Sequence, residues 1–319
     1  MLTRRSVLAQ ASALCVVAAG AGRTIAAGPR PQTTATFEVP RGACDAHVHV
    51  IGDPRKFPMS PHRDYTPPAA TAEELLQVLK FLNLDRVVIV TPTIYDDNAA
   101  TLAAIRLLGR ERARGIAFVE QTMPSEFLDS LRDSGVAGVR LFLTGDGPFD
   151  PAHAVRHLEN AIDLAKPRSW HLQISTPPDV IGALLPQLAA SPVPIVLDYF
   201  GWVEGGVEQP GFDAILSLLR SGRAYIKFAE AYRLSKQPPD YQDLVPVIRA
   251  ILEANTDRVL WGSGWPHVSG SVAGRAKTDL APNLPVDPGH LLNLLSVWVP
   301  DADTRRKILV DNPARLYGF

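Results

Sequence analysis

The sequence predicts an α/β protein folded as a (β/α)8 TIM barrel. Eight short segments rich in Val, Ile and Leu alternate along the chain with amphipathic segments. The short segments are mostly apolar on both faces, which is typical of strands buried in a parallel sheet. Eight strand–helix units in a chain of this length favour a closed barrel. The expected strands are 44–50, 86–91, 115–120, 138–143, 170–174, 195–199, 224–229 and 258–262.

The segments between the strands carry helix signals. In "TAEELLQVLKFL", Thr71 and Glu74 form a capping box ahead of a leucine-rich stripe. In "FDAILSLLRSG", Gly222 stands where a helix favours glycine at its C-terminal end. An open doubly wound sheet is the alternative fold, but no glycine-rich phosphate loop follows any expected strand. We therefore expect the active site at the carboxyl ends of the barrel strands.

The first residues have the features of an export signal. Residues 1–27 begin with the paired Arg4 and Arg5, continue with an apolar stretch and end in small residues. The twin arginine favours the Tat export machinery, so we expect a periplasmic or secreted protein. Residues 28–39 are expected to be a linker and residues 40–319 a single barrel domain. The alternative for the N-terminus is an uncleaved membrane anchor.

The composition narrows the classes of partner. The formal net charge of the 319 residues is -1, with no basic block and no acidic tail, which argues against nucleic acid or an anionic membrane surface. No later segment is apolar for long enough to span a bilayer, so we expect no stable membrane insertion after cleavage. Of the two cysteines, only Cys44 would remain, so the barrel is expected to have no internal disulfide.

The strongest local motif is "CDAHVHV" in the first expected strand. Asp45, His47 and His49 alternate, so in a regular strand all three side chains face the same way. On the first strand of a barrel this direction is inward. Two histidines at this spacing can share a metal ion or contact one ligand with two ring nitrogens, and the alternative is a pair of structural histidines.

The chain resembles the amidohydrolase superfamily, in the branch that includes 2-pyrone-4,6-dicarboxylate lactonase. The matching segments span nearly the whole expected domain in the family's order. They are "CDAHVHVIGDPRKFPMSPHRDYTP", "DRVVIVTPTIYDDN", "GVAGVRLF", "IKFAEAYRLS", "LWGSGWPH" and "DNPARLYGF". The resemblance implies a (β/α)8 barrel that acts on small lactones or carboxylates, in a branch whose members work without a metal.

The chain departs from the family at two catalytic positions. Tyr199 in "VLDYFG" stands where the family generally has a histidine, and Gly264 stands where the lactonases have their general-base aspartate. A catalytic zinc usually needs three protein ligands, and His171 is the candidate third beside His47 and His49. Since the aspartate is missing and an arginine lies nearby, we expect no cofactor, with a divalent metal such as zinc as the alternative.

The cationic residues expected to bind substrate are Arg140, Lys227 and Arg233. Buried cations at strand ends need an anionic partner, and an arginine can hold a planar carboxylate with two hydrogen bonds. The alternative is that Arg140 pairs with Asp45 and Lys227 with a neighbouring acid.

The resemblance adds loop residues to the expected site. Tyr65 and Tyr95 are similar to family residues that hydrogen-bond a lactone, and His267 keeps a family position near the site mouth. The alternatives are two ordinary loop tyrosines and a histidine that caps a helix. Asp311-Asn312-Pro313 is interpreted structurally, with Asp311 and Asn312 as candidate caps of a last helical turn.

Together these features predict a hydrolase of a small carboxylated lactone or related ester. His47, His49 and the cations would activate the carbonyl, and His49, His171 or a Tyr199 of lowered pKa would replace the missing base. On this hypothesis Gly264→Asp should raise turnover. The alternatives are a lactone isomerase, in which a hydroxyl of the substrate attacks the carbonyl, and a periplasmic binding protein for a lactone or dicarboxylate.

Overall fold

The computed structural model describes residues 28–144 and 149–319, and it shows eight parallel strands in one sheet, in the order β1 to β8. The predicted (β/α)8 barrel is confirmed. All eight expected strands are present, although β3 and β4 each begin two residues before the predicted start. The strands are β1 Cys44–Val48, β2 Arg86–Val90, β3 Ala113–Ala117, β4 Val136–Leu141, β5 His171–Ile174, β6 Ile195–Leu197, β7 Ala224–Ala229 and β8 Val259–Gly262.

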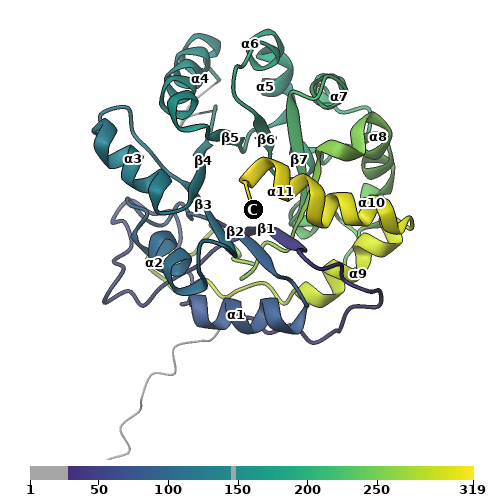
Figure 1. Ribbon diagram of the computed structural model, residues 1–319, viewed down its shortest axis with the longest axis horizontal. Helices are drawn as coiled ribbons and strands as arrows, with labels where there is room; N and C mark the ends of the chain where they lie inside the picture. Colours follow the sequence, from purple (N-terminus) through teal and green to yellow (C-terminus); the bar gives the residue numbers. More distant parts are fainter. Residues whose placement is uncertain (1–27, 145–148) are drawn as a thin grey trace, which may run out of the picture.

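Helices form an outer ring around these strands (Figure 1). The α-helices are α1 Ala72–Phe81, α2 Ala99–Leu108, α3 Ser125–Asp133, α4 Pro151–Ala165, α5 Pro178–Ala183, α6 Leu185–Ala189, α7 Phe212–Arg220, α8 Val245–Asn255, α9 Pro288–Trp298, α10 Ala302–Arg306 and α11 Asn312–Tyr317. Short 3-10 turns lie at Lys166–Arg168, Tyr199–Trp202, Ala231–Arg233, Gln242–Leu244 and Thr256–Arg258, and a π-helical turn lies at Lys307–Asp311. The chain 263–287 between β8 and α9 is a long loop.

Two predicted helix ends are confirmed. The Thr71 hydroxyl accepts the N–H of Glu74 (3.3 Å), and the Glu74 carboxylate accepts the N–H of Thr71 (2.7 Å), so the capping box begins α1. Gly222 follows the end of α7 with a φ of 71°, in the left-handed region that glycine adopts at little cost.

Bonds just beyond the paired strands join β8 to β1 and close the barrel. The N–H of Gly264 donates to the carbonyl of His47 (2.8 Å). The Asp45 carboxylate accepts the N–H of Ser263 (2.9 Å) and that of His47 (3.2 Å). Burial raises the pKa of Asp45 to about 6. Asp45 therefore helps to join the first and last strands.

An irregularity in β1 changes which of its residues face the barrel interior. The pairing register with β2 shifts after Asp45, as it does where a strand carries an extra residue. Cys44 and Ala46 pack in an apolar cluster with residues of β2, β3, β6, β7 and β8. The expectation that Asp45 shares one inward face with His47 and His49 is therefore wrong, because the alternation restarts after Ala46.

The C-terminal helix α11 covers the end of the barrel at which the strands begin, and Figure 1 shows the C-terminus over the barrel centre. Tyr317 packs into the interior apolar cluster, with its ring 5.3 Å from that of His171. Asn312 donates to the carbonyls of Thr256 (2.9 Å) and Val259 (2.8 Å). The expected side-chain caps at Asp311 and Asn312 are not formed, because Asn312 instead anchors α11 to the start of β8.

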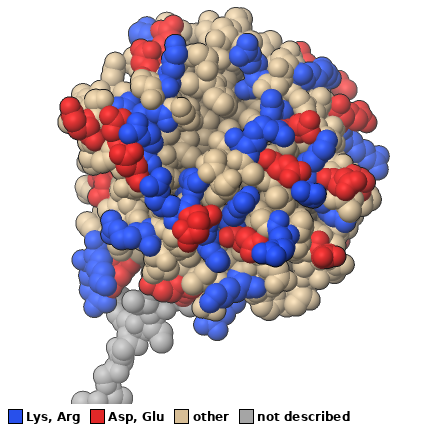
Figure 2. All heavy atoms as spheres, viewed as in Figure 1, with Lys and Arg blue, Asp and Glu red and all other residues tan. Residues whose placement is uncertain are grey.

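The expected export signal, residues 1–27, lies outside the described residues. The expected linker is in contact with the barrel: the Asp287 carboxylate accepts the N–H groups of Gln32 and Thr33 (both 3.0 Å). Within the described ranges, each helix is too short or too polar to span a bilayer. Positive and negative side chains are interspersed over the face shown in Figure 2, in line with the net charge of -1.

Candidate active site

His47 and His49 present their Nε2 atoms to one buried space at the carboxyl end of β1. Nδ1 of His49 lies 2.7 Å from the Val90 carbonyl, which can only accept a hydrogen bond, so Nδ1 carries the proton. Nδ1 of His47 faces Oδ1 of Asp198 at 3.4 Å. Burial lowers the pKa of both rings, which keeps them neutral. Each Nε2 is therefore a hydrogen-bond acceptor.

Glu230 directs a carboxylate at these two nitrogens from the residue that follows β7. Its Oε1 lies 3.8 Å from Nε2 of His47 and 4.0 Å from Nε2 of His49. The backbone of Glu230 has a φ of 55°, a left-handed conformation uncommon for residues other than glycine. Glu230 was not predicted from the sequence, although an acid directly after a buried barrel strand was a signal that could have found it.

Asp198, the residue after β6, is the second buried carboxylate and was also not predicted. Its Oδ2 accepts from Gln173 (3.1 Å), and its Oδ1 lies 3.7 Å from Nζ of Lys227. Although burial acts to raise it, the contact with His47 and the charges of Lys227 and Arg140 lower the pKa of Asp198. Lys227 also donates to Gln173 (2.6 Å), and burial lowers its pKa to about 8. This fully buried lysine supports Asp198 from within the barrel.

Arg140 and Tyr199 stand beside the two histidines. Nη2 of Arg140 donates to the Tyr199 hydroxyl (2.8 Å) and lies 3.5 Å from Oδ2 of Asp198. The partner of Arg140 is therefore Asp198 and not Asp45. The Tyr199 hydroxyl is 3.4 Å from Nε2 of His47 and can donate to it. Burial raises the pKa of Tyr199 despite the nearby Arg140, so the condition for this residue to act as a base is not met.

Arg233 holds the far side of the Glu230 carboxylate. Its Nε donates to Oε2 of Glu230, and its Nη2 donates to the Val268 carbonyl (3.1 Å). The side chain of Arg233 is 23% exposed, whereas that of Glu230 is fully covered. The cluster is therefore closer to solvent at Arg233 than at Glu230.

His267 lies beside the cluster and is fully buried. Its Nδ1 is 3.4 Å from the hydroxyl of Tyr232, which also lies 3.4 Å from the Gly264 carbonyl. Burial and the charge of Arg233 lower the pKa of His267 to about 3. The ring is therefore a neutral neighbour that helps to position Tyr232.

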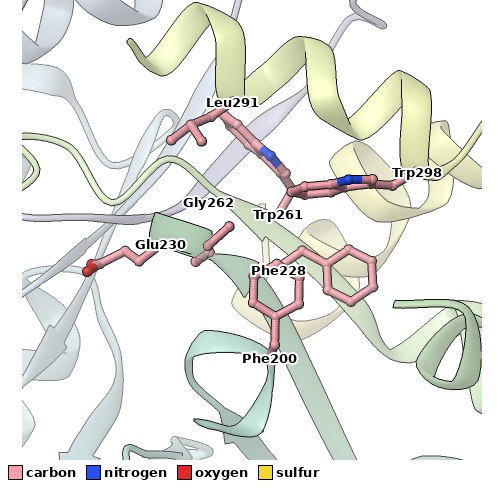
Figure 3. A pocket seen from close by; sticks show the side chains of 9 residues that line it. Phe200, Phe228, Glu230, Trp261, Gly262, Leu291 and Trp298 are labelled. Carbon is pink, nitrogen blue, oxygen red and sulfur yellow. The ribbon is translucent and has the colours of Figure 1, made fainter. Parts of the chain in front are cut away.

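Glu230 occupies the space that a side chain at position 264 would need. A Cβ at position 264 would lie 2.3 Å from Cγ of Glu230 and 2.7 Å from the Tyr232 hydroxyl. The φ of Gly264 is 74°, which adds backbone strain for any other residue. The gain in turnover expected for Gly264→Asp stays a prediction, and the new side chain would have to displace Glu230 to enter this space. Figure 3 shows that the Glu230 side chain points away from the packed rings of Phe200, Phe228, Trp261 and Trp298.

The other predicted residues differ in their distance from this cluster. Burial raises the pKa of the half-buried Tyr65, although a hydrogen bond with Thr93 and the charges of Arg233 and Arg140 act to lower it. The Tyr95 hydroxyl accepts the N–H of Gly52 (3.1 Å), and burial raises its pKa to about 12. The structure does not bring His171 to the site, because this residue begins β5 at the opposite end of the barrel.

The geometry brings acceptor atoms together in a closed, polar space. Nε2 of His47, Nε2 of His49 and a carboxylate oxygen of Glu230 lie within 4.8 Å of one another. Oε1 of Glu230 has no hydrogen-bond partner among the residues that the structure describes. Three converging acceptors call for a species that donates protons or carries positive charge between them, such as a water molecule or a metal ion.

The chain is similar to known proteins over most of its length. The family model described as Amidohydrolase matches residues 44–319. The chain is 35% identical to a 4-sulfomuconolactone hydrolase of Rhizobium radiobacter, over 91% of this chain and 95% of the relative. It is 34% identical to a 2-pyrone-4,6-dicarboxylate hydrolase of Comamonas testosteroni, over 88% of this chain and 92% of the relative.

A solved structure shares the architecture as well. It is a probable 2-pyrone-4,6-dicarboxylic acid hydrolase of Acinetobacter baumannii with citric acid bound, and it matches with a TM-score of 0.71 and 27% identity. The match covers 87% of this chain and 100% of that chain. The family match over nearly the whole described domain and the two long alignments lead to one conclusion. The chain belongs to the amidohydrolase family.

Proposed function

We propose that this protein is an enzyme that hydrolyses a small lactone, or a related ester, bearing an anionic group such as a carboxylate. The observation that carries the proposal is the convergence of Nε2 of His47, Nε2 of His49 and Oε1 of Glu230 beside the guanidinium of Arg140. Two relatives that align over almost the whole chain are named as lactone hydrolases, which supports the same reaction class.

The residues divide into acceptors and donors around the reacting bond. The neutral rings of His47 and His49 offer lone pairs, so one of them can orient a water molecule by accepting one of its hydrogens while the other hydrogen points to Glu230. Arg140 and the hydroxyl of Tyr199 can donate to the carbonyl oxygen as it gains negative charge. The oxyanion is therefore stabilised by the guanidinium and the phenol, while the imidazoles face the water.

The anionic group of the substrate would be held by guanidinium N–H groups that the protein leaves free. Both hydrogen bonds of Arg140 to described residues come from Nη2, which leaves Nε and Nη1 for a ligand. Arg233 lies closer to solvent than Glu230. Paired N–H donors in a buried site favour a planar carboxylate or a similar oxyanion.

A divalent metal fits the same three atoms. Two histidines and one glutamate form a donor set that catalytic zinc sites use, and the Nδ1 atoms face Asp198 and the Val90 carbonyl as metal-bound histidines usually do. A metal held there would supply a Lewis acid that polarises the lactone carbonyl. We nevertheless propose metal-independent hydrolysis, because Arg140, Lys227 and Arg233 already surround the two carboxylates with positive charge.

Isomerisation of the lactone is the second candidate, since it needs no water. The free oxygen of Glu230 favours hydrolysis over this candidate, because it lies beside two further acceptors that suit a bound water molecule. A binding protein without turnover has less support, since a cationic pocket alone would not need three converging acceptors.

The proposal is tested with a panel of anionic lactones and esters followed by NMR. The panel includes 4-sulfomuconolactone and 2-pyrone-4,6-dicarboxylate, and each reaction is run with and without a chelator. We expect a ring-opened acid to appear at a rate that the chelator leaves unchanged. A new lactone without free acid would show isomerisation, and ligand binding without turnover would show a binding protein.

We also propose that the enzyme is exported by the Tat route and acts in the periplasm or outside the cell. The support is the sequence of residues 1–27 with its paired Arg4 and Arg5. Changing both arginines to lysine should leave the protein in the cytoplasm, as measured by cell fractionation. Unchanged export of this variant would contradict the Tat assignment.

A further inference from the structure

We propose that Glu230 is the general base of the reaction and has taken over from the carboxylate that is absent at position 264. The inference rests on the proposed hydrolysis and deepens it. It starts from a steric relationship: Cγ of Glu230 lies 2.3 Å from where a Cβ at position 264 would stand. One carboxylate arm can pass through this space, and it comes from the end of β7 instead of the end of β8.

The contacts of the two Glu230 oxygens differ in the way that a base requires. Oε2 is bound by Nε of Arg233, which fixes the direction of the carboxylate. Oε1 faces Nε2 of His47 (3.8 Å) and Nε2 of His49 (4.0 Å) and has no hydrogen-bond partner among the described residues. An oxygen that is oriented but unpartnered, next to two acceptors, is placed to receive a proton from a water molecule between them.

The backbone supports the same assignment. Glu230 has a φ of 55° and Gly264 a φ of 74°, so both strand ends use left-handed conformations to bring the carboxylate across. Such a conformation is strained for a residue other than glycine. Glu230 holds it at the centre of the polar cluster, where strained residues are often functional.

Glu230 alone can carry the proton through the whole reaction. The water oxygen forms a bond to the lactone carbonyl carbon while Glu230 takes one of its protons. The bond between that carbon and the ring oxygen then breaks, and the proton passes from Glu230 to the departing ring oxygen. The products are a carboxylic acid, which ionises in water, and a hydroxyl group on the same molecule, and Glu230 is again a carboxylate.

The test moves the carboxylate between the two positions. Glu230→Gln keeps the shape of the side chain and should lower kcat by about a hundred- to ten-thousandfold with little change in KM. Glu230→Ala should be as slow. The double variant Glu230→Ala with Gly264→Asp should regain at least about tenfold of the lost kcat, because the new carboxylate enters the vacated space. Glu253→Gln, an exposed residue of α8, is the matched control.

The results distinguish a general base from other roles of Glu230. A Glu230→Gln variant that keeps its kcat would overturn the inference, as would a folded double variant no faster than Glu230→Ala. Folding of each variant is checked by circular dichroism and by binding of 2-pyrone-4,6-dicarboxylate in calorimetry. If the double variant does not fold, addition of formate to Glu230→Ala should restore turnover, and failure of this rescue would count against the base.

Two further outcomes separate this inference from the proposed function. Purified protein with one zinc ion per chain that Glu230→Gln loses would make Glu230 a metal ligand, and the base assignment would fall while hydrolysis stands. A wild-type protein that opens no lactone of the panel would overturn the proposed function and the inference with it.

Discussion

The carboxylate of Asp198 faces the ring of His47, with Oδ1 3.4 Å from Nδ1, and both side chains are fully buried. This contact sets the tautomer of His47, because the nitrogen that faces the carboxylate carries the proton. Nε2 is then free to accept from the opposite side, where Glu230 and the hydroxyl of Tyr199 lie. Asp198 thus determines what the ring of His47 can do.

Replacing Asp198 should therefore weaken catalysis through the ring. In Asp198→Asn the negative charge beside His47, Lys227 and Arg140 is lost, and the amide can donate to Nδ1 and reverse the tautomer. We expect kcat to fall by about ten- to a hundredfold, as is typical when the partner of a catalytic histidine is removed. Steady-state kinetics on the lactone measure it, with the exposed Asp213→Asn as control. Equal rates in both variants would show that Asp198 is structural only.

Arg140 should contribute to substrate binding through the N–H groups that the protein leaves free. Arg140→Ala removes these donors and the bond to Tyr199, so we expect KM for an anionic lactone to rise by about tenfold or more. The KM for a neutral ester should rise much less. The exposed Arg106→Ala on α2 is the matched control for loss of one positive charge. A similar rise in KM for the neutral ester would contradict a role in holding the anion.

The close approach at Gly264 should appear as a loss of stability. Gly264→Ala would place a methyl group against Glu230, whereas a Cβ at Gly274 would meet nothing within 4 Å. The two glycines have similar φ values of 74° and 79°, so an alanine at either position has the same backbone cost of about 1–2 kcal/mol. Gly264→Ala should then lose about 1–3 kcal/mol more, measured by urea unfolding. Equal losses would mean that the space is not filled as described.

The buried histidines should make the folded protein less stable in acid. Burial lowers the pKa of His171, and that of His267, from 6.5 to about 3 in the folded protein. Between these values the unfolded chain binds protons that the folded protein does not, so stability is complete above about pH 6.5 and falls as the pH drops towards 3. Each ring contributes a slope of about 1.4 kcal/mol per pH unit.

The change His171→Gln should reduce this slope by the share of one ring. His171 lies at the end of the barrel opposite the site, so its replacement reports on stability without removing a catalytic group. The free energy of unfolding is measured in urea at several pH values, with the exposed His62→Gln as control. If both variants keep the slope of the wild type, the loss of stability in acid has another source.

The barrel was predictable from the sequence because its signals are local. Apolar runs of strand length, the capping box at Thr71 and Gly222 after α7 each depend on neighbouring residues, and the structure confirms them. The face of the first strand was not predictable in the same way. The irregularity in β1 depends on how this strand pairs with β2, which alternation within one strand does not reveal.

The site was predictable only as far as the residues stand in family positions. His47, His49, Arg140 and Arg233 were named from the sequence and come together in the structure. Glu230 was not predicted because the resemblance places the general base of the family on the eighth strand and not on the seventh. The exchange of a carboxylate between β7 and β8 depends on a steric contact across two strands, and such a contact appears only in three dimensions.

Hydrolysis at the cluster is tested by turnover of an anionic lactone by the wild-type protein in water enriched in oxygen-18. Attack by a water molecule held between His47, His49 and Glu230 predicts a ring-opened acid whose new carboxylate carries one heavy oxygen, detected by mass spectrometry. A product that carries none, such as a rearranged lactone, or a substrate returned unchanged, would contradict hydrolysis at this cluster.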